Sequence, residues 1–273
     1  SGNSLSKTKR NSLNKKVAVI GTGITGCMLS YMLARKGIEV DLFEQSDSIC
    51  SAASSHEMLV TYPRLSAHDS PFGRFNLQSY IYATNFYDNL HTAAWKKTGV
   101  ILLNHDESTE KRQSSLLEKR SDGMIYQYVN CDEATEISGI KLELNGLLYK
   151  DAGYILPNEI CRFLIDSPKI NLFTSSEVKN LSTSKGITSF TVNEKDYEYK
   201  DVCLCAGSDT SKLIEIEGFN RKRGQVTHIK TRDNISNIKL PVCAKGYISP
   251  QVNDLHIVGS SYSDEDHAEL TEE

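Results

Sequence analysis

The sequence predicts an α/β fold built on a parallel sheet, with an inserted antiparallel β-sheet domain of the α+β class. Three observations predict it. A short apolar run rich in β-branched residues, 17–20, leads directly into a glycine-rich loop, a helix and a second strand. A carboxylate, Glu44, ends that second strand. Between residues 99 and 156, and again after residue 223, short strands replace further strand–helix units.

The loop has the spacing G-x-G-x-x-G, and each glycine has a physical role. Gly21 permits the tight turn, Gly23 lets the backbone approach a pyrophosphate, and Gly26 lets the following helix pack closely on the strand. The N-terminus of that helix offers free N–H groups to phosphates. The glycines alone would be a weak signal, but strand, loop, helix, strand and acid in register indicate a Rossmann-type dinucleotide site.

Glu44 stands about 20 residues after the loop, where a carboxylate accepts hydrogen bonds from both ribose hydroxyls of a dinucleotide. A negative charge at this position disfavours a 2′-phosphate. The sequence therefore predicts FAD or NAD rather than NADP.

The first half of the chain continues with a loop and a mixed region. Small residues at 51–55 fit a segment that passes close to a cofactor, although a plain surface loop fits their composition equally well. Apolar residues at three- and four-residue spacing then predict a long amphipathic helix over 71–95. The other elements expected before residue 157 are strands at 99–103, 146–149 and 153–156 and helices at 106–123 and 131–137.

The second half predicts one more buried strand of the parallel sheet. Residues 201–205 end in Ala206-Gly207, small residues that allow the backbone to lie against a cofactor. The other elements expected here are a helix at 159–167, strands at 170–173, 187–192, 197–199, 223–227, 246–250 and 256–260, and a new helix from Asp264.

Composition limits the protein class. The chain has 273 residues, 39% of them hydrophobic, and a net charge of −4, ordinary values for one large or two modest globular domains. No apolar run approaches the roughly 20 residues of a membrane span, and no signal peptide is present. Seven cysteines without a regular framework indicate reduced thiols and a cytoplasmic protein. Cys203 and Cys205 share one face of a strand and predict packing, not a metal site.

Positive charge is concentrated in two segments. The first sixteen residues carry five basic side chains and no acidic one, and they predict a disordered basic leader over residues 1–14. The second segment holds Arg221, Lys222, Arg223, Lys230 and Arg232. A solvated face accounts for this run, and contact with phosphates is the alternative.

Motifs spread over the chain resemble the glycine oxidase/D-amino-acid oxidase superfamily of FAD-dependent amine oxidases. The distinctive parts resemble the FAD-dependent oxidoreductase module of bacterial tRNA-modification proteins of the MnmC type. Beyond the glycine-rich loop and Glu44, the motifs that carry the resemblance are Ala53-Ser54, Tyr62-Pro63-x-Leu65-Ser66, Ser70-Pro71-x-Gly73-Arg74-Phe75, Arg223-Gly224-Gln225-Val226, Cys243-x-x-Gly246-Tyr247-x-x-Pro250-Gln251 and Gly259-Ser260-Ser261-Tyr262. The segment 246–262 is the most specific of them.

The resemblance implies FAD as the cofactor and a tRNA wobble uridine as the substrate. A hydride would pass to the flavin from the methylene beside the secondary amine of 5-carboxymethylaminomethyl(-2-thio)uridine. Hydrolysis of the imine would then give 5-aminomethyluridine and glyoxylate. Such an oxidation needs an unprotonated amine, an aligned C–H bond and a dry site more than a strong base. A fused or separate methyltransferase is a further partner that the resemblance implies.

The motifs and the resemblance together give the expected site residues. Tyr247 and Lys245 lie in the segment that matches the family's substrate-facing strand, and with Arg223 they are the catalytic or substrate-binding candidates. Packing is the alternative for Tyr247, and ion pairing is the expected role of Arg74. The residues expected to contact FAD are Gly21, Gly23, Ile24, Thr25, Gly26, Glu44, Gln45, Ala53, Ser54, Val178, Cys205, Ala206 and Gly207.

Two departures from the family pattern affect these expectations. His56 and Leu59 replace an amide and a glycine near the expected isoalloxazine ring, which predicts a changed flavin environment or an altered substrate. The chain also lacks the final Gly-x-Arg stretch and strand–helix of the family, so the C-terminal part of the fold is expected to be missing. Weak or absent FAD binding would follow unless another segment supplies that part.

The expected domains are discontinuous. An FAD-binding domain is expected over 15–70, 151–210 and 251–273, and a substrate domain over 71–150 and 211–250. Two other functions stay open. One is oxidation of a free small amine such as glycine, sarcosine or a D-amino acid. The other is a non-catalytic flavoprotein remnant or a cofactor-free interaction domain.

Overall fold

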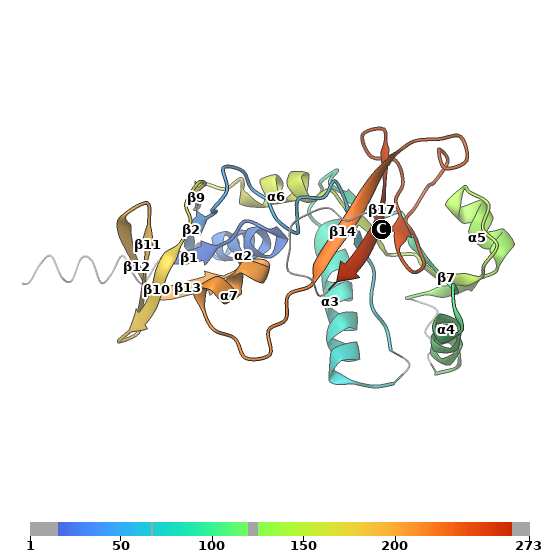
Figure 1. Cartoon of the computed structure of the whole chain (residues 1–273), viewed down its shortest axis with the longest axis horizontal. Coiled ribbons are helices and arrows are strands. Elements are labelled where there is room, and N and C mark those ends of the chain that lie inside the picture. The colour runs from blue at the N-terminus through green and yellow to red at the C-terminus, as the bar shows by residue number, and fades with distance from the viewer. Residues whose placement is uncertain (1–15, 67, 120–124, 264–273) are drawn as a thin grey trace, which may run out of the picture. The chain divides into compact units, whose positions relative to one another are not determined.

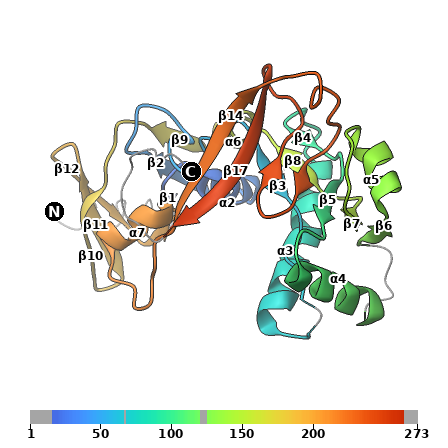
Figure 2. The same ribbon diagram turned by 45° about the vertical axis from the view of Figure 1, so that its right-hand side comes forward.

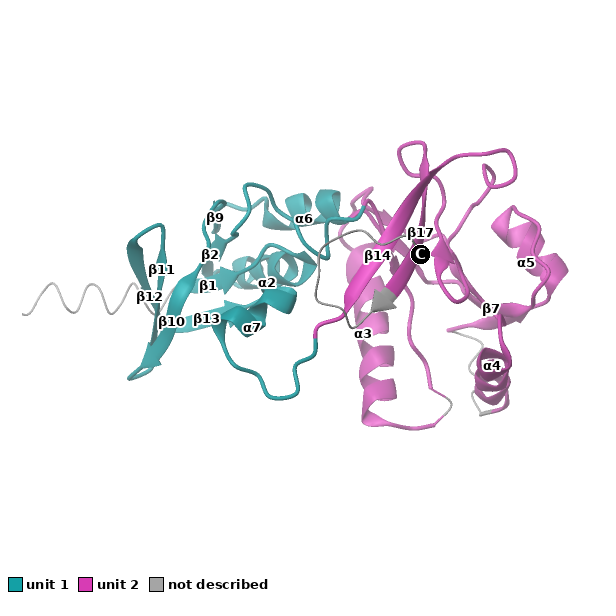
Figure 3. Cartoon of the chain, viewed as in Figure 1, with its two compact units in different colours: residues 1–56, 157–220 teal, residues 57–156, 221–273 magenta. Residues whose placement is uncertain are grey.

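The computed structural model describes residues 16–66, 68–119 and 125–263 (Figure 1). The chain divides into two compact units, and each is assembled from two stretches of sequence. Unit 1 comprises residues 1–56 and 157–220, and unit 2 comprises residues 57–156 and 221–273 (Figure 3). The leader predicted over 1–14 and the helix predicted from Asp264 lie outside the described residues.

Unit 1 contains the predicted parallel sheet. Its four strands run parallel in the order β13-β1-β2-β9. A separate antiparallel sheet has the order β10-β11-β12. The strands are β1 Lys16–Ile20, β2 Glu39–Phe43, β9 Ile170–Phe173, β10 Lys179–Ser184, β11 Ile187–Val192, β12 Lys195–Tyr199 and β13 Asp201–Leu204. The helices are α2 Ile24–Arg35, α6 Pro157–Ile165, the 3₁₀ turn η1 Gly207–Asp209 and α7 Thr210–Leu213.

The composition of β1 explains why its sheet is covered on both faces. Ala18, Val19 and Ile20 are all 5% exposed or less. Ala18 and Ile20 belong to a core cluster with Phe43 and Phe190, which joins the parallel sheet to the antiparallel one. Val19 belongs to a different cluster that reaches α2. Because alternate strand residues point to opposite faces, an uninterrupted apolar run is what such a strand requires.

Unit 2 is built on a larger mixed sheet (Figure 2). Its seven strands lie in the order β14-β17-β16-β15-β5-β7-β6, and only the β15–β5 pair is parallel. A second, antiparallel sheet has the order β3-β8-β4. The strands are β3 Leu59–Thr61, β4 Trp95–Lys96, β5 Val100–Leu103, β6 Gln127–Val129, β7 Gly146–Tyr149, β8 Gly153–Ile155, β14 Arg223–Lys230, β15 Val242–Cys243, β16 Tyr247–Ile248 and β17 Leu255–Ser263. The helices are α3 Pro71–Asp88, α4 Glu107–Lys119 and α5 Cys131–Ser138.

Helix α3 is shorter than the sequence predicts. The side chain of Ser70 caps its first turn by accepting a hydrogen bond from Gly73 N at 3.0 Å, and Pro71 occupies the first helical position. The helix ends at Asp88 rather than near residue 95. Trp95 instead lies in β4, and its Nε1 donates to Asp88 Oδ1 at 2.7 Å. The apolar spacing therefore continued beyond the true end of the helix.

The unit boundaries differ from the predicted domain boundaries. Residues 57–70, 151–156 and 251–263 lie in unit 2, whereas the sequence suggested the FAD-binding domain. The reason is strand pairing: β3 pairs with β8, and β17 pairs with β14 and β16. The division into a cofactor domain and a substrate domain stays a prediction. No helix within the described ranges is long and apolar enough to cross a bilayer.

Candidate cofactor site

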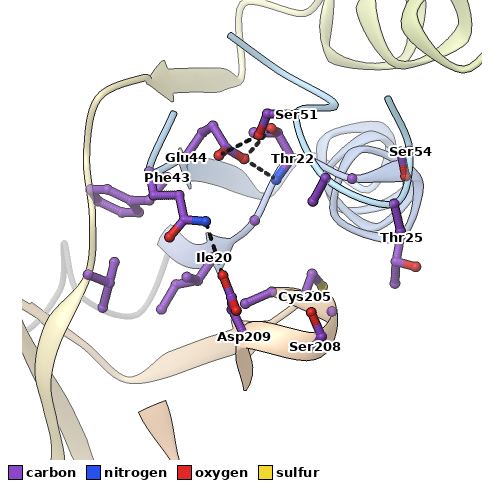
Figure 4. A pocket seen from close by; sticks show the side chains of 18 of the residues that line it. Ile20, Thr22, Thr25, Phe43, Glu44, Ser51, Ser54, Cys205, Ser208 and Asp209 are labelled. Carbon is purple, nitrogen blue, oxygen red and sulfur yellow. Dashed lines mark hydrogen bonds between the residues drawn. The ribbon is translucent and has the colours of Figure 1, made fainter. Parts of the chain in front are cut away.

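A pocket of about 310 Å³ opens in unit 1 where β1, β2 and β13 end (Figure 4). The chain adds β2 and β9 on one side of β1 and returns to add β13 on the other side. Such a switch point, at the carboxyl ends of parallel strands, is where open α/β sheets bind ligands. The pocket volume is within the range of small-molecule and cofactor sites.

The pocket gathers nearly all of the residues that were expected to contact a cofactor. All thirteen except Gly26 line it, including segments as far apart in sequence as Glu44 and Cys205. Gly26 has another role, because a Cβ at this position would lie 1.9 Å from Gly21 O. Gly26 therefore permits the close approach of α2 to the loop and does not line the pocket.

The loop geometry leaves room for a phosphate. Gly21 has φ +104°, and a Cβ on it would lie 2.5 Å from Cys205 O, so only glycine fits. A Cβ on Gly23 would meet, among the described residues, only Ser54 Oγ within 4 Å, at 3.3 Å. Gly23 is the N-cap of α2, and the next N–H, from Ile24, donates to Ser54 Oγ at 3.2 Å. A helix N-terminus beside an open space of this kind suits an anionic group.

Glu44 is 6% exposed, and its carboxylate is fully engaged. One oxygen, Oε2, accepts hydrogen bonds from the backbone N–H (3.0 Å) and the hydroxyl of Thr22. The other, Oε1, accepts from Ser46 N at 2.9 Å and from Ser51 Oγ at 3.3 Å. A carboxylate offers about four acceptor positions. All four positions are filled here, two by backbone N–H groups and two by side-chain hydroxyls.

The wall opposite Glu44 contains a second polar group. Asp209 accepts a hydrogen bond from Gln45 Nε2 at 3.2 Å and forms an ion pair with Lys212 Nζ at 2.9 Å. Beside it, burial raises the pKa of the Cys205 thiol to about 11, so this side chain is neutral at physiological pH. The pocket thus combines apolar side chains, such as Ile20, Phe43 and Val178, with the carboxylates of Glu44, Glu177 and Asp209.

A family comparison identifies this fold. The model of the DAO family, described as FAD dependent oxidoreductase, matches residues 16–273. The chain belongs to the DAO family. Its cofactor is FAD, and its family is that of the FAD dependent oxidoreductases, as the sequence predicted.

Individual proteins support the assignment. The DAO chain is 32% identical over 251 residues to the "tRNA 5-methylaminomethyl-2-thiouridine biosynthesis bifunctional protein MnmC" of Legionella pneumophila (strain Corby). The match covers 89% of this chain but 37% of the relative, so the chain spans little more than a third of the length of that protein.

Solved structures confirm the fold. Glycine oxidase from Bacillus cereus superposes with a TM-score of 0.73 at 18% identity, covering 90% of this chain and 72% of that one. L-α-glycerophosphate oxidase from Mycoplasma pneumoniae, solved with FAD bound, gives a TM-score of 0.73 at 18% identity, covering 91% and 71%. At these identities the likeness establishes the DAO fold alone.

The three catalytic candidates lie in unit 2 of the DAO chain. Arg223 begins β14, and its Nη2 donates to Gln225 Oε1 at 2.7 Å. Tyr247 begins β16 and packs, half-buried, against two core clusters. Lys245 is exposed in the tight turn between β15 and β16. The strands β14 and β16 both pair with β17, so Arg223 and Tyr247 lie on the two neighbours of one strand. Their contact with a substrate stays a prediction.

Some pocket residues were not predicted. Thr22 and Ser51 both bond Glu44, and the small-residue composition of their segments was the only available signal. Ser176, Asp209 and Lys212 line the pocket from segments that follow β9 and β13. Nothing in the local sequence marks these three, because only the pairing of distant strands brings them to the pocket. As expected, Arg74 forms an ion pair, with Asp69 at 2.6 Å.

Proposed function

We propose that this chain oxidises 5-carboxymethylaminomethyl(-2-thio)uridine at the tRNA wobble position, giving 5-aminomethyluridine and glyoxylate. One observation carries the proposal: the 32% identity to an MnmC protein extends over 89% of the chain and includes both units. The printed name of that relative refers to tRNA 5-methylaminomethyl-2-thiouridine biosynthesis, and an amine oxidation in that biosynthesis suits a DAO-family chain.

FAD would bind in the unit 1 pocket. Glu44 would hold the ribose hydroxyls, and the open side of Gly23, with the N-terminus of α2, would hold the pyrophosphate. Ala53, Ser54 and the Cys205–Gly207 segment would line the remainder. When bound, FAD supplies the acceptor for a hydride and its electron pair.

The protein's own contribution is to orient the amine and its carboxylate. The substrate loses a hydride from the CH₂ between nitrogen and carboxylate and a proton from nitrogen. Water then adds to the C=N bond, whose cleavage leaves the primary amine on uridine and releases glyoxylate. Arg223 and Lys245 are cations able to bind the carboxylate, and Tyr247 would position the chain that carries it. No strong base is required, since the amine reacts in its unprotonated form.

A tRNA substrate also defines the expected partners. The basic residues between Arg221 and Arg232 supply charge for phosphate contacts, and a wobble base must leave its stack to reach a buried flavin. A methyltransferase, fused or separate, would consume the primary amine. With tRNA as its substrate, the reaction would take place in the cytoplasm.

The test uses tRNA that carries the carboxymethylaminomethyl modification. The chain is incubated with FAD and this tRNA, the nucleosides are resolved by mass spectrometry, and glyoxylate is trapped as a hydrazone. We expect equal amounts of 5-aminomethyluridine and glyoxylate, with smaller amounts of both from Glu44→Gln at limiting FAD. Oxidation of glycine or sarcosine with tRNA unchanged would replace the proposal with a free-amine oxidase. If the FAD-loaded chain turned over neither substrate, the remaining alternative would be a non-catalytic flavoprotein.

A further inference from the structure

Three buried cysteines meet behind the glycine-rich loop, outside the lining of the pocket. Cys27 belongs to α2, Cys161 belongs to α6, and Cys50 belongs to the segment that follows Glu44. Cys27 and Cys161 are fully buried, and Cys50 is 3% exposed. Cys161 interacts electrostatically with both of the other thiols, which places its side chain beside them. The cluster therefore joins three elements that the sequence gives no reason to associate.

The thiols bond one peptide group of the cofactor loop. Cys27 Sγ donates to Thr22 O at 3.2 Å, and Cys50 Sγ donates to the same oxygen at 3.6 Å. The N–H and hydroxyl of Thr22 both donate to Glu44. Thr22 is 0% exposed, so its carbonyl has no access to water and depends on the thiols. Thr22, between Gly21 and Gly23, is thus fixed by Glu44 on one side and by thiols on the other.

Cys50 reaches this position at a cost in backbone energy. Its φ is +57°, in the left-handed region that residues other than glycine rarely adopt. The residues immediately after it line the pocket: Ser51 Oγ donates to Glu44, and Ser54 Oγ accepts from Ile24 N. The Cys50 thiol also contacts Pro157 O at 3.8 Å, at the start of α6. A strained residue held at a ligand site by its surroundings is a reason to look for a functional role.

Cys50 and Cys161 stay protonated, as a donor must. Hydrogen bonding to Cys161, with burial, raises the pKa of the Cys50 thiol well above its usual range. A hydrogen bond with Cys27 likewise raises the pKa of Cys161. Thiols are weak donors, so the buried Thr22 carbonyl is bonded by two of them, and removal of the Cys50 thiol leaves it with Cys27 alone.

We propose that Cys50 is a positioning residue for FAD, which fixes the Thr22 peptide and the Ser51–Ser54 segment through its thiol. The inference rests on the proposed placement of FAD in the unit 1 pocket. Its consequence is that cofactor affinity depends on a side chain that does not touch the cofactor. The left-handed backbone at Cys50 then has a function, because it directs the thiol to Thr22.

Three variants of Cys50 separate this role from simple packing. Cys50→Ser keeps a donor, Cys50→Ala removes the donor but keeps the strained backbone, and Cys50→Gly removes both the donor and the strain. Cys243→Ala is the matched control, because Cys243 is a buried thiol in unit 2. FAD dissociation constants are measured by flavin fluorescence, and unfolding midpoints are measured without FAD.

The expected results differ in direction. Cys50→Ala and Cys50→Gly should each weaken FAD binding about 10-fold, the equivalent of one lost hydrogen bond, while Cys50→Ser and Cys243→Ala stay within about threefold of the wild type. Cys50→Gly should unfold at a higher temperature than Cys50→Ala, because glycine adopts φ +57° without strain. Wild-type affinity in Cys50→Ala, or equal losses in Cys50→Ala and Cys50→Ser, would overturn the proposal.

A second measurement needs no cofactor. Hydrogen exchange of a peptide covering residues 21–26 should be faster in Cys50→Ala than in the wild type or in Cys243→Ala. Unchanged exchange would also overturn the positioning role. If the wild-type chain binds no FAD but exchange rises in Cys50→Ala, then the cofactor placement fails while the link between Cys50 and the loop holds.

Discussion

At the scale of single residues, the cofactor loop depends on positions where only one side chain fits. Gly21 combines a left-handed backbone with a carbonyl 2.5 Å from where a Cβ would be, whereas Gly186 has φ +75° and nothing within 4 Å among the described residues. We expect Gly186→Ala to cost about 1 kcal/mol of unfolding free energy from backbone strain. Gly21→Ala should cost about 1–3 kcal/mol more, because the loop must also move. Equal losses in urea unfolding would show that the β1–β13 approach is looser than described.

Two buried tyrosines give opposite expectations for the same substitution. Tyr199 Oη donates to Asp41 Oδ2 at 2.6 Å, and Asp41 also bonds Asn171 and Lys16. Tyr199→Phe should therefore lower the unfolding free energy by about 1.5–3 kcal/mol. The buried hydroxyl of Tyr80 has no hydrogen-bond partner within the described part of the chain, so Tyr80→Phe should be neutral or stabilising. Thermal unfolding of the two variants would contradict this if Tyr80→Phe were the more damaging.

At the scale of elements, the C-terminal end of α3 is stabilised by the bonds that the Asp88 carboxylate accepts from Lys97 and Trp95, and this stabilisation is sensitive to acid. Burial opposes ionisation of Asp88, but hydrogen bonds from Lys97 and Trp95 outweigh it and lower the pKa of this carboxyl below 3.8. A lowered folded-state pKa means that the stabilisation is present above pH 3.8 and is lost as the pH falls through the folded value. Because the pair is about a third exposed, its contribution is about 1 kcal/mol or less.

The variant Asp88→Asn tests the contribution of the Asp88 carboxylate. It should unfold more easily than the wild type at pH 7, and the difference should shrink below about pH 4. The matched control is Asp69→Asn, which removes an exposed carboxylate paired with Arg74 and should change the unfolding free energy by less than about 1 kcal/mol. A difference between Asp88→Asn and the wild type that stayed constant from pH 7 to pH 3 would contradict the assignment.

The elements also show how far local sequence could predict this fold. The β1–α2–β2 unit was predictable, because its apolar run, glycines and acid lie within thirty residues and act locally. Strand β10 was not, since its KNLSTS sequence is polar and almost wholly exposed, and only pairing with β11 makes it a strand. On α3, Tyr80 and Tyr87 are buried while Phe72 and Phe75 are 64% and 70% exposed, so apolar spacing alone could not identify the packed face.

At the scale of the whole molecule, each unit needs two separate stretches of sequence. This explains why the compact units differ in their boundaries from the predicted domains. It also explains why Asp209 and Lys212 were missed, because their place at the pocket depends on pairings more than 150 residues apart, such as β1 with β13. A fragment of residues 16–156 would keep β1 and β2 but lose the neighbours of both, β13 and β9. We expect that fragment to show no cooperative unfolding of unit 1 and no FAD binding. A fragment that bound FAD would contradict the described sheet.

The most direct test of the central claim, that FAD binds in the unit 1 pocket, is a titration of the cofactor-free chain with FAD, followed by flavin absorbance and fluorescence. It is repeated for Glu44→Gln and for Glu177→Gln, a control that removes another pocket carboxylate, one paired with Lys179. We predict saturable one-to-one binding by the wild type. Glu44→Gln should weaken this binding about 10- to 100-fold, because charge-assisted bonds to the ribose are lost. Glu177→Gln should leave the affinity unchanged. Binding that Glu44→Gln leaves intact, or no binding by the wild type, would contradict it.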